Sequence, residues 1–321
     1  MQNVLLKKNW EMILVKKKVV FLAVLLLTLT LAVGFAVRYV WALHQVRQSN
    51  QAVTNFNLAD IGSTSSFSIL PLFEAWSKND DFPGGHGLSY LLTTDTAIIL
   101  LDLGNNENRS DPSPLKKNMQ TLGISFATID SVVVSHNHPD HVGGSYWWLR
   151  GAFAADNQQQ ELSGMTVYLP ETMKHPQTDT VIATTPTLIA PGVVSLGAQP
   201  YIEPFPQRVL QPLGWEQALA INVKDKGVIL VMGCGHPTLE TVVQRAETIV
   251  DEPVIGVVGG LHYLNADADD LAPHIEFLQR RNPVLVALSP HDSSGSVLQT
   301  FAAAFPDAYR YIVTGQEIVM P

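Results

Sequence analysis

The sequence contains a single cysteine among its 321 residues, and Lys, Arg, Asp and Glu together make up only 15% of it. One cysteine excludes an intrachain disulfide, so a hydrophobic core has to stabilise the fold, and a hydrophobic content of 46% is sufficient for one. The 22 glycines and 20 prolines argue against an all-helical protein, because these residues favour turns and interrupt helices.

Basic residues are scarce outside the N-terminal segment. Residues 1–43 carry six Lys or Arg and one Glu, so they contribute +5, and the rest of the chain carries −14 against a total of −9. Proteins that bind nucleic acids hold the phosphates with clustered Lys and Arg, so the acidic remainder argues against a nucleic-acid partner. We expect a small-molecule substrate instead.

Charged residues are absent from the 19-residue run VVFLAVLLLTLTLAVGFAV, residues 19–37, which is about long enough to cross a bilayer core as a helix. Lysines precede the run, and Tyr39 and Trp41 follow it, as is typical of the two ends of a membrane span. A cleaved signal peptide, which would leave a secreted protein, or a buried core helix is the alternative. The sequence predicts a cytoplasmic basic segment over 1–18, a transmembrane signal anchor over 19–43, a stalk over 44–66, and a domain over 67–321 on the extracytoplasmic side.

Strand and helix patterns alternate through this domain. Apolar runs predict strands at 67–73, 88–94, 97–102, 131–134, 253–258 and 283–288, with a hairpin around residues 224–227. Helical spacing predicts helices over 237–251, 268–281 and 294–304. We expect two mixed sheets packed together with helices outside. The proline-rich middle segment, about 153–216, is either a wall over the site or an irregular connection.

The stretch SHNHPDHVGG, residues 135–144, places three histidines and an aspartate within six residues directly after an apolar strand. His136 and His138 are two residues apart, so in extended backbone their side chains point the same way. Asp140 and His141 follow the turn at Pro139. We interpret these four polar residues as metal ligands, two imidazoles for one ion and a carboxylate plus an imidazole for a second. The alternatives are a polar surface loop and, for the aspartate, a helix cap.

Two more histidines lie in the same strand–turn–helix setting, and we expect both to be metal ligands. His236 follows the strand VILVM, and His291 follows VLVALSP. Four further candidates have a structural alternative each. These are Asp102, which would hold a ligand histidine by its other ring nitrogen or form a turn, Cys234, a thiolate ligand or a small buried residue, His262, a site residue or a core histidine, and His86, a site residue or part of a glycine-rich loop.

These motifs resemble the metallo-β-lactamase superfamily, whose H-x-H-x-D-H signature SHNHPDHVGG matches. GGHGLSYLL, GCGHPTLE, VVGGLHYL and LSPHDSSG resemble the branch named for 7,8-dihydropterin-6-yl-methyl-4-(β-D-ribofuranosyl)aminobenzene 5'-phosphate synthase. The resemblance covers about 67–318 and implies an α/β fold, a four-layer αββα sandwich with metals at the edge between the sheets. It carries ligand roles onto His136, His138, Asp140, His141, His236 and His291.

The sequence departs from the superfamily pattern at two places. GWEQAL, residues 214–219, lacks the earlier histidine that many members have, and Asp292 stands where the branch often has cysteine. Cys234 would then occupy the bridging position, or His236 would replace the missing ligand.

We therefore expect an enzyme, a dinuclear metal-dependent hydrolase of the cell membrane. Two divalent ions, zinc first with manganese or iron as alternatives, would lower the pKa of a bound water to about 7, so that hydroxide attacks an ester, lactone or phosphoester. Asp140 is the expected catalytic residue, because it would also orient the nucleophile or carry a proton. The alternatives are a mononuclear iron oxidoreductase acting on oxygen or sulfur species, and a non-catalytic metal-binding surface protein.

Overall fold

The computed structural model describes residues 2–51, 61–160, 162, 164–176, 178–209, 211–264 and 266–320. The chain divides into two compact units. One comprises Met1–Arg47 with Ile202–Leu213, and the other comprises Gln48–Tyr201 with Gly214–Pro321.

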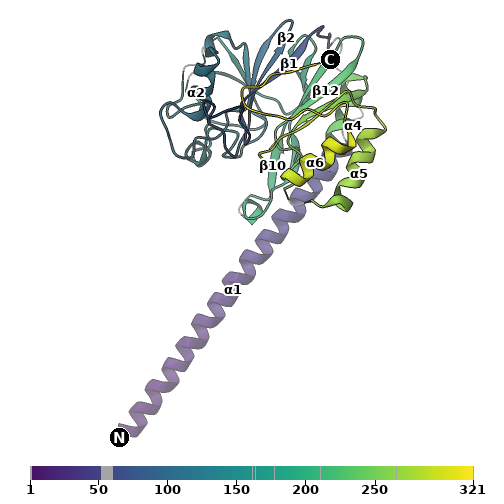
Figure 1. Ribbon diagram of the computed structural model, residues 1–321. Coiled ribbons are helices and arrows are strands. Elements are labelled where there is room, and N and C mark those ends of the chain that lie inside the picture. Colours follow the sequence, from purple (N-terminus) through teal and green to yellow (C-terminus); the bar gives the residue numbers. More distant parts are fainter. Residues whose placement is uncertain are drawn as a thin grey trace. The chain divides into compact units, whose positions relative to one another are not determined.

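The first unit consists mainly of α1 (Gln2–Gln51), a single helix (Figure 1). Its segment Met12–Ser49 is long and apolar enough to cross a membrane, with a mean hydropathy of 2.7, and none of its most apolar window is buried. The predicted anchor, 19–43, lies wholly within this helix. Residues 44–51 of the predicted stalk continue the helix, whereas 52–60 lie outside the described residues.

Two mixed sheets form the centre of the second unit (Figure 1). The first has the strand order β15-β1-β2-β3-β4-β5-β6, and the second has the order β14-β13-β12-β11-β8-β7. The first sheet contains β1 (Phe67–Phe73), β2 (Ser89–Thr94), β3 (Ile98–Leu101), β4 (Ser131–Val133), β5 (Thr166–Leu169), β6 (Asp179–Ile182) and β15 (Ile318–Val319). The second contains β7 (Thr187–Ala190), β8 (Val193–Ser195), β11 (Leu219–Val223), β12 (Gly227–Met232), β13 (Val254–Gly259) and β14 (Leu285–Leu288).

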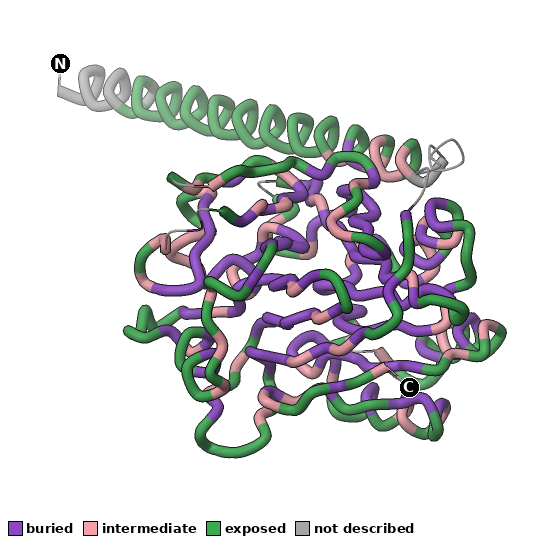
Figure 2. The backbone as a smooth tube through the Cα atoms, turned by 90° about the horizontal axis from the view of Figure 1, so that it is seen from above, coloured by how far each residue is buried: buried purple, intermediate pink, exposed green. Residues whose placement is uncertain are grey.

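Alternating side chains of the central strands separate three hydrophobic cores, seen as buried backbone in Figure 2. In β12, Leu230 packs in the core shared with α4 (Leu239–Val250), α5 (Ala268–Gln279) and α6 (Gly295–Ala304), whereas Ile229 faces the core between the sheets. In β3, Ile99 faces that same central core, and Leu100 packs in the core that includes Leu115 of α2 (Pro114–Thr121). Helices and sheets thus form four layers, and the predicted αββα sandwich is confirmed.

The candidate site residues follow the carboxyl ends of neighbouring parallel strands. Leu101 of β3 pairs with Val133 of β4, and Met232, Gly259 and Leu288 are in register at the ends of β12, β13 and β14. The segments that leave these strands therefore emerge side by side, as at the ligand-binding edge of other open sheets. They carry Asp102, residues 135–141, residues 234–236, His262 and residues 289–292.

The middle segment is more regular than its sequence predicts. It contains β5 to β8 and a separate two-stranded sheet of β9 (Gln199–Ile202) and β10 (Leu213–Glu216). Each of these strands has only three or four residues, too few for a clear hydrophobic period. An irregular connection is therefore the wrong interpretation of 153–216.

The helix after the histidine cluster is also shorter than expected. It is reduced to α3 (Ser145–Trp148), and its N-cap is Gly144 without a side-chain hydrogen bond. The alternative role of Asp140 as a helix cap is therefore wrong, which leaves its carboxylate available to the site.

Gly143 offers a test of how tightly the histidine loop is held. Its φ is +93°, and a Cβ there would lie 1.8 Å from the carbonyl oxygen of Ala154. Because that oxygen belongs to the backbone, we expect Gly143→Ala to lower the free energy of unfolding by about 2 kcal/mol or more. Gly295→Ala is the control, since Gly295 is the first residue of α6 and a Cβ there would meet no atom within 4 Å. Denaturant unfolding measures both variants, and equal stability would contradict the prediction.

Candidate metal centre

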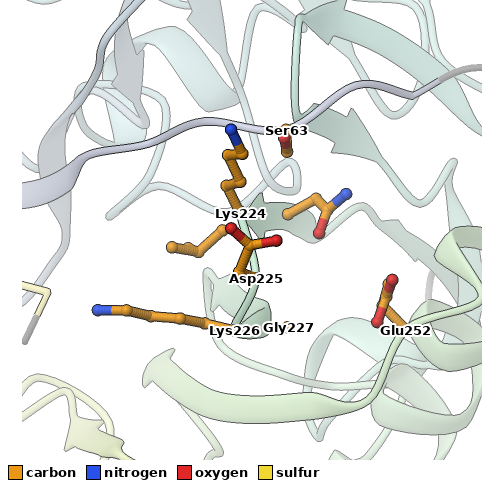
Figure 3. Close-up of a pocket in the computed structure, with 8 residues that line it drawn as sticks. Ser63, Lys224, Asp225, Lys226, Gly227 and Glu252 are labelled. Carbon is orange, nitrogen blue, oxygen red and sulfur yellow. The ribbon is translucent and has the colours of Figure 1, made fainter.

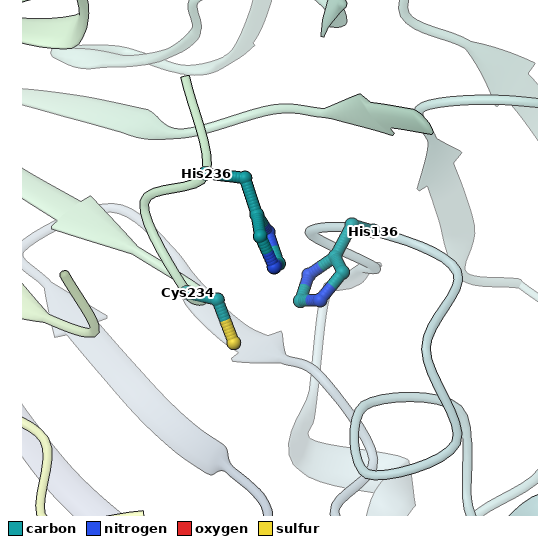
Figure 4. A group of neighbouring side chains, drawn as sticks. All are labelled: His136, Cys234 and His236. Carbon is teal, nitrogen blue, oxygen red and sulfur yellow. The ribbon is translucent and has the colours of Figure 1, made fainter. Parts of the chain in front are cut away.

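Two groups of side chains converge on Cys234. His136, Cys234 and His236 have ligand atoms within 4.8 Å of one another (Figure 4), and so do His141, Cys234 and His291. The Sγ of Cys234 lies 3.2 Å from His141 Nε2 and 3.4 Å from His291 Nε2. The structure therefore gathers four of the six predicted ligands around a cysteine whose role the sequence left open.

The other two predicted ligands each extend one of these groups. His138 Nδ1 lies 3.0 Å from His136 Nε2, and Asp140 Oδ2 lies 3.8 Å from His141 Nε2. The ring of His138 is also 5.0 Å from that of His236, measured between centroids. The arrangement thus has a half built around His136 and a half built around His141, with sulfur between them.

Three of the histidines have a carboxylate at the ring nitrogen that points away from the centre. Asp102 lies 2.7 Å from His141 Nδ1, and Glu216 lies 2.8 Å from His236 Nδ1. The third carboxylate, Glu74, is 3.5 Å from the Nδ1 of His291. A carboxylate at one ring nitrogen fixes the tautomer and the ring orientation, which leaves Nε2 as the lone-pair donor.

Asp102 holds both the ring of His141 and the loop that carries the histidine cluster. Its side chain accepts hydrogen bonds from the N–H and the hydroxyl of Ser135, both at 2.6 Å. It is fully buried and has a φ of +58°, a conformation that few residues other than glycine adopt. The position of this carboxylate is thus set by the backbone as well as by packing.

Glu216 ends β10 in GWEQAL and fixes the turn that carries Cys234. Its carboxylate accepts hydrogen bonds from the N–H groups of Cys234, Gly235 and His236, at 3.0, 2.8 and 2.9 Å. Burial alone would raise the pKa of Glu216, but His236 and the backbone donors lower it to about 2. GWEQAL lacks a histidine, yet it supplies the carboxylate that orients one.

Glu74 performs the corresponding role for His291 through a buried network. The hydroxyl of Ser289 donates to Glu74 and contacts the Nδ1 of His291. The hydroxyl of Tyr90 also donates to Glu74, at 2.6 Å. Since Glu74 follows β1 and Ser289 follows β14, this network joins the two sheets behind the site.

The charges inside the site favour a bound cation. Burial raises the pKa of Asp140, but the neighbouring His141, His291 and His86 outweigh it, so the pKa lies well below its usual range. Burial lowers the pKa of His136, and the surrounding imidazoles lower it further. A carboxylate that stays charged and an imidazole that stays neutral are the protonation states that metal ligation requires.

The rim of the site carries two histidines and a tyrosine. His86 Nε2 is 3.2 Å from Asp140 Oδ2, with 63% of the His86 side chain exposed. His262 is also exposed, and its ring centroid is 5.0 Å from that of His236. Tyr201 stacks on His236 with 4.3 Å between centroids. These three residues border the buried centre, where a substrate would approach it.

The residues present fit a metal ion. In the described part of the chain, His236 Nε2 is buried without a hydrogen-bond partner, while its Nδ1 is held by Glu216. A buried polar atom without a partner is costly, and coordination to a cation would remove that cost. Imidazole, thiol and carboxylate groups together suit zinc or iron better than magnesium or calcium.

Sequence reasoning missed the residues that hold the candidate ligands. Glu74 and Glu216 each follow an apolar strand, which is the feature that identified Asp102. The same criterion could have found both. Ser135 and Ser289 are short polar residues next to candidate ligands and carry no distinguishing pattern.

A polar pocket elsewhere in the second unit is unconnected with the histidines. It is lined by Ser63, Lys224, Asp225, Lys226 and Glu252 among others (Figure 3). The pocket lies at the turn between β11 and β12, whereas Cys234 follows the opposite end of β12. Its lining carries both charge signs and no histidine or cysteine, so it is not the candidate metal centre.

Comparison with known proteins supports the resemblance seen in the motifs. Residues 82–155 match the family model of the metallo-beta-lactamase superfamily. A 7,8-dihydropterin-6-methyl-4-(beta-D-ribofuranosyl)-aminobenzene-5'-phosphate synthase of Methanocaldococcus jannaschii is 26% identical over 260 residues, which are 70% of this chain and 86% of that protein. The crystal structure of Tm1679, described as a metal-dependent hydrolase of the beta-lactamase superfamily, superposes with a TM-score of 0.57 at 22% identity, covering 78% of this chain and 98% of the other.

These findings confirm the suspected superfamily and branch, and the structural likeness confirms the fold. Together with the groups of potential metal ligands, they support a metal-dependent hydrolase in general terms.

Glu216→Gln tests the role of the buried carboxylate. The pKa of Glu216 is lowered from 4.5 to about 2 on folding. Its charged form therefore contributes stability, roughly 3 kcal/mol, that is fully present above about pH 4.5 and is lost as the pH falls towards 2. We expect the metal-free variant to be less stable at pH 7 and to lose less stability between pH 5 and 3 than the parent.

Glu240→Gln is the matched control, because Glu240 also contacts a histidine, His274, but on α4 away from the centre. Thermal unfolding across this pH range compares the two variants. Equal pH dependence of Glu216→Gln and the parent would refute the assigned role.

Proposed function

We propose that this chain is a dinuclear metal-dependent hydrolase of ester, lactone or phosphoester bonds in small molecules. The observation that carries the proposal is the pair of ligand groups that share Cys234. His136, His138 and His236 would hold one ion, and Asp140, His141 and His291 the other. Cys234 lies between them, where many relatives have a bridging ligand.

The metal ions would supply two things when bound, a water of lowered pKa and polarisation of the oxygen under attack. Asp140 has a further role because its carboxylate stays deprotonated and lies towards the rim, beside His86. It can accept a hydrogen bond from the attacking water and so orient that water towards the substrate. His86 and His262 are exposed on different sides of the centre and can contact polar groups of the substrate.

The size of the substrate follows from the narrow approach to the site. Tyr201 and the two rim histidines surround buried ligands, which suits a small molecule rather than a polymer. The archaeal relative is named for the synthesis of a phosphate ester, so phosphoesters belong in the substrate panel beside esters and lactones.

Metal content is the decisive measurement. We expect elemental mass spectrometry of the detergent-purified full-length chain to find about two ions, zinc foremost, as dinuclear hydrolases of this kind hold. His236→Ala should lose much of that metal and reduce hydrolysis of the panel about 100-fold or more. His274→Ala is the control, since His274 lies on α5 and pairs with Glu240.

Other outcomes would refute the proposal. One iron per chain with oxygen uptake would favour the mononuclear oxidoreductase. A full metal complement without turnover of any ester, lactone or phosphoester would favour the binding protein. No metal after supply of zinc, manganese and iron would exclude the candidate centre.

We also infer that α1 anchors the protein in the cell membrane, with the second unit on the extracytoplasmic side. This rests on the apolar segment of α1 and on the lysines that precede residue 19. The protein should resist alkaline extraction of membranes, and protease added from the extracytoplasmic side should digest the second unit. Full-domain protein in the soluble fraction would instead indicate cleavage of the N-terminal segment.

A further inference from the structure

A third group of potential ligand atoms lies beside the two halves of the centre. One ligand atom each of Cys234, His262 and Asp292 falls within 4.8 Å of the others. His262 follows β13 and Asp292 follows β14, so this group belongs entirely to the second sheet. The proposed dinuclear centre can supply three histidine or aspartate ligands to each ion without sulfur. Cys234 is therefore available to this third group.

Asp292 is buried in surroundings that lack a basic side chain. Only 1% of it is exposed. Its carboxylate accepts hydrogen bonds from the N–H of His262 at 2.9 Å and from the hydroxyl of Ser293 at 3.3 Å, both neutral donors. Within the described residues no Lys or Arg pairs with it, which leaves the neighbouring His291 as the nearest group that can be positive. A buried carboxylate in such a place is favourable when a cation shares the site.

The glycine pair before His262 exists to admit this carboxylate. A Cβ at Gly260 would lie 2.2 Å from Asp292 Oδ2 and 2.3 Å from the carbonyl oxygen of Gly233. His262 itself has a φ of +57°, which is strained for a residue with a side chain. Strain of this kind is found where a site requires it, and here it brings the N–H of His262 onto Asp292.

We propose that Cys234, His262 and Asp292 form a third metal-binding position, additional to the two of the dinuclear centre. Its donor set of sulfur, nitrogen and oxygen suits a divalent first-row ion such as zinc. Because His262 is exposed, the fourth position of a tetrahedral ion is open to water or to a substrate group. The inference rests on the proposed function only in assigning the other six ligands elsewhere.

The test counts ions in the full-length chain, purified in detergent and loaded with zinc or with cobalt(II). Asp292→Asn keeps the size of the side chain and an oxygen that accepts from the N–H of His262, but it removes the charge. We expect the parent to hold about three ions and Asp292→Asn about two, since one donor set is lost. The cobalt–thiolate absorption should weaken in the variant as well. His262→Ala should give the same loss, and His274→Ala should leave both readouts unchanged.

Two results would overturn the third position while leaving the dinuclear centre intact. One is a parent with two ions and an Asp292→Asn variant that also keeps two. The other is a fall from two to one, which would make Asp292 a ligand of one of the first two ions. Failure of the dinuclear centre is recognised separately, because His236→Ala would then lose no metal. Circular dichroism confirms folding, and if Asp292→Asn does not fold, His262→Ala decides by the same counts.

Discussion

The site depends on the contact between buried carboxylates and the outward ring nitrogens of the histidines. Asp102, Glu216 and Glu74 fix three rings from behind, and each also binds a neighbouring loop through backbone N–H or hydroxyl donors. Burying a carboxylate is costly, and only full hydrogen bonding offsets that cost. The same contacts that satisfy these charges therefore aim the Nε2 atoms of the histidines at a common point, and the loops have little freedom to drift.

That arrangement is possible because the two sheets meet at one edge. Asp102 and the histidine cluster follow β3 and β4 of the first sheet, whereas Cys234 and His291 follow β12 and β14 of the second. The core between the sheets, which includes Ile99 and Ile229, holds these loops at a fixed separation. The network of Glu74 with Ser289 crosses the same boundary at the site itself. Packing of the sheets and geometry of the centre are thus coupled.

Features that are local in the sequence could be predicted, and features that are distant could not. The histidine cluster is visible because its members occupy six residues, and the strands and helices around it have clear periods. Glu216 and His236 are 20 residues apart, and Glu74 and Ser289 are 215 apart. Each of these acids reads in the sequence as a single charge beside an apolar run. The strands between 153 and 216 were missed for another reason, since three or four residues do not establish a pattern.

The position of the chain's only cysteine has a chemical consequence. Cys234 lies among histidines at the centre, and no second thiol exists anywhere in the sequence. An oxidant that reached this sulfur would form a sulfenic acid that no cysteine of the same chain can capture as a disulfide. Recovery would depend on a small external thiol able to enter the site. On an oxidising face of a membrane, the durability of the protein would then be set by access to one sulfur atom rather than by the stability of its fold.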